Sequence, residues 1–338
     1  MKAWILSEEF GLDALELTEI ETPTPAPSEV LVRVRAASLN YHDIMVIGGH
    51  YGGLPPKRLV PVADGAGEIV AVGEAVTRVK VGDRVAGNFA QRWIHGRADL
   101  ATLLGSTLGS PRDGMLAEYV LLDAEGAVKI PDHLSFEEAS TLPIAGVTAW
   151  HALFGAGPLA PGSTVLVQGT GGVALFALQF ARLAGARVIV TSGSDEKGAR
   201  AREYGADEVI NYQKISAWDA RALELTEGQG VDLVVELAGG DLRRSVNALR
   251  WGGRLSLIGL LAGTAAQFDI VPFMTKKLTL HGIAVGPRTL FEEMNVAVAR
   301  HGLRPIIHRS YAFEDARAAL ADFGQAQHVG KLVIRGAD

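Results

Sequence analysis

The stretch that decides the fold is TVLVQGTGGVALFALQFARLAGARVIVTSGS, residues 164–194. A short run of β-branched and apolar residues leads into a glycine-rich turn, then a helical apolar pattern, then a second short apolar run. This order predicts a strand–helix–strand unit. Because both strands are apolar throughout, we expect them to lie parallel in a sheet that helices cover on both faces.

The glycine-rich turn has the spacing of a dinucleotide-binding loop, with Gly169, Gly171 and Ala174 at the fingerprint positions and Gly172 beside them. The first glycine permits a tight turn, the second lets the backbone approach a pyrophosphate, and the small third residue lets the helix pack closely. Such turns also occur for packing reasons alone. Here the turn follows a strand and opens a helix, so we expect a dinucleotide with its phosphates at the helix N-terminus.

The end of the second strand bears on the choice between NAD and NADP. An NAD enzyme usually places an acidic residue there, to bond the ribose hydroxyls. This strand instead runs into Ser192 and Gly193, which leave room for a 2′-phosphate, with Lys197 one turn further on. Asp195 and Glu196 weaken the argument unless they serve as helix N-terminal acids. The pattern favours NADP, with a solvated surface lysine as the alternative interpretation of Lys197.

The rest of the chain divides into a β-rich first part and an alternating second part. Runs at 29–39, 65–73 and 117–122 predict short strands, and Ser135 with Glu138 forms a capping-box pattern that begins a helix. Further apolar runs at 206–212, 231–239, 254–263 and 278–286 predict the remaining strands of the parallel sheet. The closing segment 313–336 predicts one helix and one strand, which would return to the first domain.

The composition excludes several classes of protein. The chain has 338 residues, 48% hydrophobic content, a net charge of −6 and no cysteine. A mildly acidic chain does not suit non-specific nucleic-acid binding, and the missing cysteines exclude disulfides, thiolate nucleophiles and cysteine-based zinc sites. The start MKAWILSEEF lacks a signal-peptide core, and no apolar run has the length of a membrane span. We expect a cytoplasmic protein.

A second informative stretch is ASLNYHDIMVIGGHYG, residues 37–52, which is rich in polar side chains. His42, Asp43 and His50 could hold a metal ion. The stretch could instead line an organic pocket in which Tyr51 does the chemistry. The residues alone leave both readings open.

The whole chain resembles the medium-chain dehydrogenase/reductase superfamily, through motifs such as GAGEIVAVGEAV, LPIAGVTAWHAL, GADEVINY, LRWGGRLSLIG and GKLVI. The resemblance implies an α/β protein. A GroES-like, β-rich catalytic domain would take residues 1–145 and 286–338. A Rossmann domain with a doubly wound parallel sheet would take residues 146–285.

The same resemblance argues against a metal. Zinc members carry ligands where this chain has Asn40, Ala63–Asp64 and Ile144, and four structural cysteines where segment 88–114 has none. We therefore expect neither a catalytic nor a structural zinc. The segment 88–114 would rim the cleft, where Trp93, His95 and Leu104 could contact substrate.

The stretch LNYHDIMVIGGHYG is similar to the zinc-free quinone oxidoreductase and enoyl reductase branch, and that similarity implies site residues. Tyr51 would donate a hydrogen bond, Asn40 would face the nicotinamide or the substrate carbonyl, and Asp43 would fix the loop. Gly193, Lys197 and Tyr212 match a 2′-phosphate site. The resemblance also implies that Thr148, Gly259 and Leu260 lie near the nicotinamide.

These points predict an NADPH-dependent, zinc-free reductase of small-molecule enones or quinones. Without a Lewis acid, an enone or quinone is easier to reduce than a simple ketone, because the developing charge delocalises onto an oxygen that one or two donors can stabilise. The alternatives are an alcohol/ketone dehydrogenase of the same fold and an NADPH-binding protein with little turnover. The superfamily also implies a homodimer, which would pair through 278–286.

Overall fold

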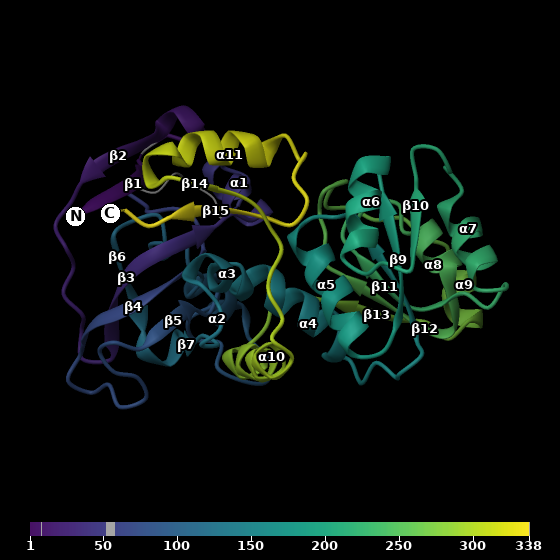
Figure 1. Cartoon of the computed structure of the whole chain (residues 1–338), viewed down its shortest axis with the longest axis horizontal. Coiled ribbons are helices and arrows are strands. Elements are labelled where there is room, and N and C mark those ends of the chain that lie inside the picture. The colour runs from purple at the N-terminus through teal and green to yellow at the C-terminus, as the bar shows by residue number, and fades with distance from the viewer. Residues whose placement is uncertain (8, 52–57, 338) are drawn as a thin grey trace. The chain divides into compact units, whose positions relative to one another are not determined.

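The computed structural model describes residues 1–7, 9–51 and 58–337. The chain divides into two compact units. The first comprises Met1–Val147 and Val285–Asp338, and the second comprises Thr148–Ala284. Figure 1 draws the first unit in purple to blue with the yellow C-terminal elements, and the second in teal and green.

The first unit is built on a seven-stranded sheet. Its path follows the order β14-β15-β3-β4-β5-β7, with β6 paired to β3, and a separate hairpin joins β1 to β2. The strands are β1 (Lys2–Leu6), β2 (Leu15–Glu19), β3 (Glu29–Ser38), β4 (Asp64–Val72), β5 (Arg84–Gly87), β6 (Tyr119–Asp123), β7 (Ala127–Lys129), β14 (Ile307–Tyr311) and β15 (Lys331–Arg335).

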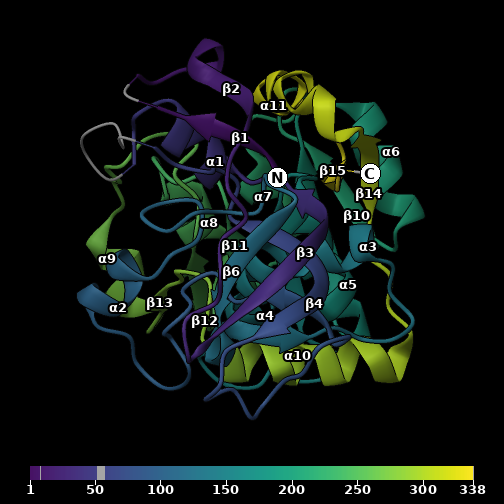
Figure 2. The ribbon, with the colours of Figure 1, turned by 90° about the vertical axis from the view of Figure 1, so that its left-hand side faces the viewer.

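The central strand of this sheet, β3, brings distant parts of the chain together. It pairs antiparallel with β4, β6 and β15, and β3 and β4 cross the front of Figure 2 side by side. The pairing of β15 with β3 confirms that the closing strand returns to the first domain. As a result, residues near 40 and near 331 are neighbours.

The helices of the first unit are short, apart from those near the C-terminus. The α-helices are α1 (Tyr41–Ile47), α2 (Leu100–Gly105), α3 (Phe136–Ser140), α10 (Arg288–His301) and α11 (Ala316–Gly324), and a π-helical turn covers Leu142–Gly146. Three 3₁₀ turns cover Leu12–Ala14, Ala124–Gly126 and Phe313–Asp315. The predicted capping box is present at α3, where Glu138 N donates to Ser135 Oγ (3.1 Å) and Ser135 N donates to Glu138 Oε2 (2.8 Å).

The hydrophobic core of the first unit is formed largely by side chains of the sheet strands. Strand side chains such as Val32, Ile69, Leu122 and Leu332 are almost completely buried. Each buried aliphatic side chain contributes about 1.5–3 kcal/mol relative to an exposed one. The sheet is therefore a rigid support for the short helix α1 that follows β3.

The second unit has the parallel sheet that the sequence predicted. Six strands pair in the order β10-β9-β8-β11-β12-β13, and all of these pairs are parallel. The strands are β8 (Thr164–Gln168), β9 (Arg187–Ser192), β10 (Glu208–Asn211), β11 (Val231–Glu236), β12 (Leu249–Leu257) and β13 (Thr279–Gly282). Its helices are α5 (Gly172–Leu183), α6 (Asp195–Glu203), α7 (Trp218–Leu225), α8 (Arg243–Ala248) and α9 (Ile270–Thr275), and α4 (Val147–Phe154) begins at the boundary between the units.

This strand order decides where a ligand can bind. The first strand of the unit, β8, has β9 on one side and β11 on the other, so the chain reverses its direction of travel there. Ligands of such sheets bind beyond the carboxyl ends of the strands at this switch point. The glycine-rich turn follows β8 at that place.

None of the described helices is both long enough and apolar enough to cross a lipid bilayer.

Candidate active site

The glycine-rich turn presents an open backbone to a ligand. Gly169 has a φ of 79°, which only glycine adopts readily, and its N–H donates to the carbonyl of Thr191 at 2.8 Å. A Cβ placed on Gly169 or on Gly171 would have no atom within 4 Å. Gly172 is the first residue of α5, and Ala174 is buried. The turn therefore leaves the N-terminus of α5 accessible, as a pyrophosphate requires.

The end of β9 contains the residues predicted to hold a 2′-phosphate. A Cβ on Gly193 would lie 2.6 Å from Tyr212 Oη, so the Tyr212 phenol packs directly over the glycine. Ser192 is buried, and its hydroxyl donates to the carbonyl of Ser194 at 2.9 Å. Burial lowers the pKa of Lys197, which lies in the first turn of α6 and whose N–H donates to the Ser194 hydroxyl. Gly193, Lys197 and Tyr212 are thus placed around one turn.

The acid next to this turn is already engaged. Asp195 pairs with Lys214 and accepts a 2.6 Å hydrogen bond from Asn211 Nδ2. The hydrogen bond from Lys214 lowers the pKa of Asp195. Its negative charge is therefore compensated by groups at the end of β10.

A cavity of about 420 Å³ lies at the carboxyl ends of β11, β12 and β13. Gly259 must be glycine, because a Cβ there would lie 1.6 Å from the carbonyl oxygen of Leu237. Gly259 and Leu260, both expected near the nicotinamide, line this cavity, whereas Thr148 is buried in α4 and does not line it. The lining residues are Gly239, Gly240, Leu257, Ile258, Gly259, Leu260, Gly263, Thr264, Ala265, Ala266, Gly282, Ile283 and Ala284.

One wall of the cavity is fixed by a buried carboxylate that sequence reasoning missed. Glu236, at the end of β11, accepts hydrogen bonds from the N–H groups of Ala238 and Gly239, each at 3.1 Å. Its other oxygen accepts from Gln168 Nε2 at 2.7 Å and from the Ser245 hydroxyl. Gln168 directly precedes the glycine-rich turn, so this network ties that turn to the cavity wall. An acid that ends an apolar strand was the available signal.

In the first unit, the polar stretch that begins at Ala37 comprises the end of β3, helix α1 and the turn after it. The backbone N–H of Asn40 donates to Asp43 Oδ2 at 2.8 Å, and the N–H of Ala63 donates to Asp43 Oδ1 at 3.0 Å. Asp43 is completely buried. It therefore joins α1 to the strand that begins at Asp64.

Asn40 lies between two buried charges. Its Oδ1 accepts a 2.6 Å hydrogen bond from Lys331 Nζ, and its Nδ2 donates to Asp64 Oδ2 at 2.9 Å. Lys331 also donates to the carbonyl of Leu39 at 2.6 Å. Desolvation raises the pKa of Asp64 and lowers the pKa of Lys331, while the attraction between the two opposes both shifts. We refer to Asn40, Asp64 and Lys331 as the buried polar triad.

The backbone around the triad adopts uncommon conformations. Val62 has a φ of 70°, which is rare for a β-branched residue and costs of order 1–3 kcal/mol. The N–H of Met115 donates to the carbonyl of Val62 at 2.6 Å and helps to hold it. On the other side, the π-helical turn directs the N–H of Ile144 to both oxygens of Asp64, each at 3.1 Å. Strained residues and π-helical turns are frequent at functional sites.

The positions that carry zinc ligands in zinc relatives do meet here, but their side chains do not fit a zinc ion. Asn40 has both ends of its amide bonded, the Asp64 oxygens already accept hydrogen bonds from the Asn40 amide and from the N–H of Ile144, and the Ile144 side chain has no atom that could bind a metal. The ammonium group of Lys331 supplies a buried positive charge at the same place. Among the described residues, no group of three or more acidic or histidine side chains could hold a metal. His42, Asp43 and His50 therefore do not form such a group.

An aromatic cluster lies next to this network. The ring of His42 meets Tyr51 edge-on, with centroids 4.5 Å apart, and meets Phe89 in the same manner at 5.1 Å. Burial raises the pKa of Tyr51, so its phenol stays protonated at neutral pH. Tyr51 is thus held as a hydrogen-bond donor at the last described position before segment 52–57.

The expected cleft-rim segment 88–114 is anchored by α10. The N–H groups of Arg288 and Thr289 donate to the carbonyls of Trp93 (2.9 Å) and Ile94 (3.1 Å) and so satisfy the first turn of the helix. Trp93 is buried, and its indole donates to the carbonyl of Gly96. Trp93 is therefore scaffold. His95 is exposed, and the side chain of Leu104 lies outside the described part of the structure.

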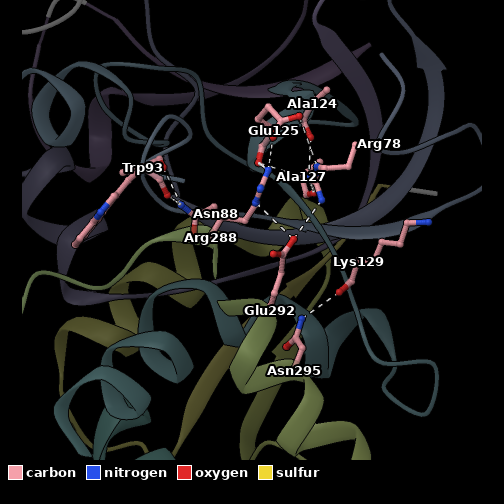
Figure 3. Close-up of polar contacts among 11 residues, drawn as sticks. Arg78, Asn88, Trp93, Ala124, Glu125, Ala127, Lys129, Arg288, Glu292 and Asn295 are labelled. Atoms are coloured by element: carbon pink, nitrogen blue, oxygen red, sulfur yellow. Dashed lines mark hydrogen bonds and ion pairs between the residues drawn. The ribbon is translucent and has the colours of Figure 1, made fainter. Parts of the chain in front are cut away.

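A charge cluster holds the same helix from the other side. Figure 3 shows Arg78 and Arg288 with Glu292 between them, at 3.3 Å from Arg78 and 3.5 Å from Arg288. Arg288 also pairs with Glu125, and Arg78 donates to the carbonyl of Ala124 at 2.8 Å. Glu125 and Glu292 neutralise the charges of both arginines. The cluster therefore has a structural role and is not an anion-binding site.

Two family models match the chain. One describes an alcohol dehydrogenase GroES-like domain and matches residues 26–132, and the other describes a zinc-binding dehydrogenase and matches residues 172–300. The chain is 40% identical to a zinc-type alcohol dehydrogenase-like protein of Schizosaccharomyces pombe, over 96% of each chain. It is 30% identical to a quinone oxidoreductase of Lama guanicoe, over 99% of this chain and 97% of the relative.

Solved structures match the chain over nearly its whole length as well. A protein of Sinorhizobium meliloti 1021, solved as a candidate alcohol dehydrogenase, matches with a TM-score of 0.92 and 41% identity over 99% of this chain and 98% of the other. The chain belongs to the medium-chain dehydrogenase/reductase superfamily. The predicted fold class, a GroES-like domain with a Rossmann-type parallel sheet, is confirmed. The chain is an oxidoreductase with a nicotinamide cofactor.

Proposed function

We propose that this protein is an NADPH-dependent, zinc-free reductase of conjugated enones or quinones. The buried polar triad carries this proposal. Its hydrogen bonds use the polar side-chain atoms of Asn40 and Asp64, at two of the positions where zinc relatives hold the metal, and Lys331 provides the compensating charge. Because no group of the described residues could hold a Lewis acid, the favoured substrates are those whose negative charge can delocalise during hydride transfer.

NADPH is the proposed cofactor because of the turn after β9. Gly193 and Tyr212 are in contact, Lys197 lies in the first turn of the next helix, and Asp195 is engaged by Lys214 and Asn211. The 2′-phosphate would meet a lysine and a phenol there, with the nearest acid already compensated. The cofactor supplies a hydride, and Gly259 and Leu260 would lie beside its nicotinamide.

The first unit would supply the groups that act on the substrate. Tyr51 would donate a hydrogen bond to the carbonyl oxygen as negative charge develops on it. Asn40 and Asp43 would act by position, because both are fully engaged in holding α1 and the strand after it. The Asn40 side chain would face the substrate, and its hydrogen bonds to Asp64 and Lys331 would fix its orientation.

A second candidate is an alcohol/ketone dehydrogenase. The similarity to the zinc-type alcohol dehydrogenase-like protein of Schizosaccharomyces pombe and the match to the zinc-binding dehydrogenase family favour it. It would need an electrophile that the described residues do not provide. Measured zinc content and sensitivity to chelators separate the two candidates.

The experiment is a turnover panel with metal analysis. NADPH or NADH oxidation is followed with 2-cyclohexenone, 9,10-phenanthrenequinone and cyclohexanone, with and without EDTA. The proposal expects turnover of the enone or the quinone, preference for NADPH, no effect of EDTA and less than one zinc per ten chains. Cyclohexanone turnover that EDTA abolishes would support the second candidate.

We also propose that the protein is a homodimer that pairs through β13. This strand ends the order of the parallel sheet, and large apolar side chains are exposed on and near it at Leu261, Ile270, Val271, Met274 and Leu280. An open edge strand with apolar neighbours favours pairing with a second copy. Sedimentation of Met274→Glu should show monomers, whereas Val296→Glu, an exposed position on α10, should stay dimeric.

A further inference from the structure

His42 has a buried ring nitrogen that the proposed function has not used. The side chain is 11% exposed and lies between the rings of Tyr51 and Phe89. Its Nδ1 is 3.3 Å from Asp43 Oδ1. Its Nε2 is buried and has no hydrogen-bond partner among the described residues. A buried polar atom without a partner calls for an explanation, and a substrate is one.

The contact with Asp43 fixes which nitrogen carries hydrogen. The Asp43 carboxylate already accepts two backbone N–H groups, so it acts as an acceptor at this site. Nδ1 must therefore be the donor in this contact. That leaves Nε2 as a lone pair in the neutral ring and as an N–H in the charged ring. A histidine oriented in this way by a carboxylate is suited to proton transfer through its other nitrogen.

We propose that His42 Nε2 is the proton donor that completes the reduction, next to the Tyr51 hydroxyl that stabilises the enolate. This inference rests on the proposed function and deepens it. In enone reduction, hydride forms a C–H bond at the β-carbon while the C=C electrons move to the carbonyl oxygen. The enolate then takes a proton from the charged His42 ring, so that a C–H bond forms at the α-carbon as the Nε2–H bond breaks and the neutral Nδ1–H ring remains. A proton from solvent restores the charged ring, and the reaction consumes one proton in total.

The side chain of His42 contacts Asp43, Tyr51 and Phe89. Asp43 lies on the same helix, Tyr51 follows that helix, and Phe89 follows β5. Asp64 and Lys331 lie beyond Asn40 in the buried polar triad. Asp43 is thus the charged partner of the ring, and Tyr51 is the titratable group against its face.

The test compares His42→Gln with His301→Gln. The glutamine amide can still donate to Asp43 but cannot deliver a titratable proton, and His301 is exposed at the end of α10. The probe is 2-methylcyclohex-2-enone, reduced with unlabelled NADPH in D₂O. The wild type and His301→Gln should place deuterium on one face of the α-carbon, and their kcat should fall at high pH. His42→Gln should lose about a hundredfold or more in kcat, lose the high-pH decline, and give deuterium on both faces.

The outcomes separate this inference from the proposed function. Turnover by His42→Gln with the wild-type pH profile and one-faced labelling would overturn the proton-donor role and leave conjugate reduction intact. Failure of the wild type to reduce any acceptor would overturn the proposed function. ¹⁵N spectra of histidine-labelled wild type then test the dyad by itself. The Nδ1–H tautomer of His42 is expected, and the Nε2–H tautomer would overturn the inference without any need for turnover.

Discussion

Lys331 Nζ, at the start of β15, donates a 2.6 Å hydrogen bond to Asn40 Oδ1, at the start of α1, and both residues are buried. The other end of the same amide donates to Asp64 Oδ2. One neutral side chain thus links a buried cation to a buried acid. Lys331 and Asn40 occupy the place where zinc relatives hold their metal. Their hydrogen bond connects the last strand of the chain to the proposed active site.

The first prediction concerns the stability of the buried polar triad. Lys331→Met leaves Asp64 buried without its cation and should lower the free energy of unfolding by about 3–5 kcal/mol. The double variant Asp64→Asn/Lys331→Met removes both charges and should recover most of that loss. Urea unfolding followed by circular dichroism measures both. Equal losses in the single and double variants would mean that the two charges are not coupled.

The second prediction is the pH dependence of the same pair. The pKa of Asp64 is raised to about 7, so its contribution to stability is lost as pH rises through 7. The pKa of Lys331 is lowered to about 8, so its contribution is lost as pH falls through 8. The stability of the uncharged double variant relative to the wild type should therefore be highest at pH 7–8. Unfolding at pH 5, 7.5 and 10 tests this, and a constant difference across the three would contradict it.

The third prediction concerns Tyr51. Tyr51→Phe keeps the ring that packs on His42 but removes the hydroxyl. With 2-cyclohexenone, kcat should fall about a hundredfold to a thousandfold while KM changes little, because the hydrogen bond strengthens as charge develops on the substrate oxygen. The exposed Tyr41→Phe is the matched control and should keep wild-type rates. A change in KM alone would assign Tyr51 to substrate binding instead.

The fourth prediction tests the phosphate site after β9. Lys197→Met should weaken NADPH binding about tenfold to a hundredfold, the effect of losing about 1.5–3 kcal/mol from a charged hydrogen bond. NADH binding should not change, since it has no 2′-phosphate. Fluorescence titration of both cofactors gives the two constants, and Lys2→Met, in an exposed pair with Glu314, is the control. Parallel loss of both cofactors would point to a structural role for Lys197.

Much of the fold could be predicted because its signals are local. The strand, glycine turn and helix of residues 164–194 are contiguous, and the capping box of Ser135 and Glu138 lies within one turn. The return of the closing strand was predicted as well, since an apolar run after a helix needs a sheet to join.

The buried polar triad could not be predicted in the same way. Lys331 and Asn40 are 291 positions apart, and nothing near either residue indicates a partner. All that the sequence offers is a lysine at the start of an apolar strand. The role proposed for His42 was not predicted for a related reason, because its ring packs against Phe89, which comes from another segment. Long-range packing of polar groups is the part of the site that only the folded chain reveals.

The measurement that tests the account most directly is where hydride goes. 2-Cyclohexenone is reduced with NADPH that carries deuterium at C4 of the nicotinamide, on protein whose zinc content has been measured. A zinc-free conjugate reductase should form cyclohexanone with deuterium at C3. Deuterium at C1 of an allylic alcohol, formed only by zinc-loaded protein, would contradict the account.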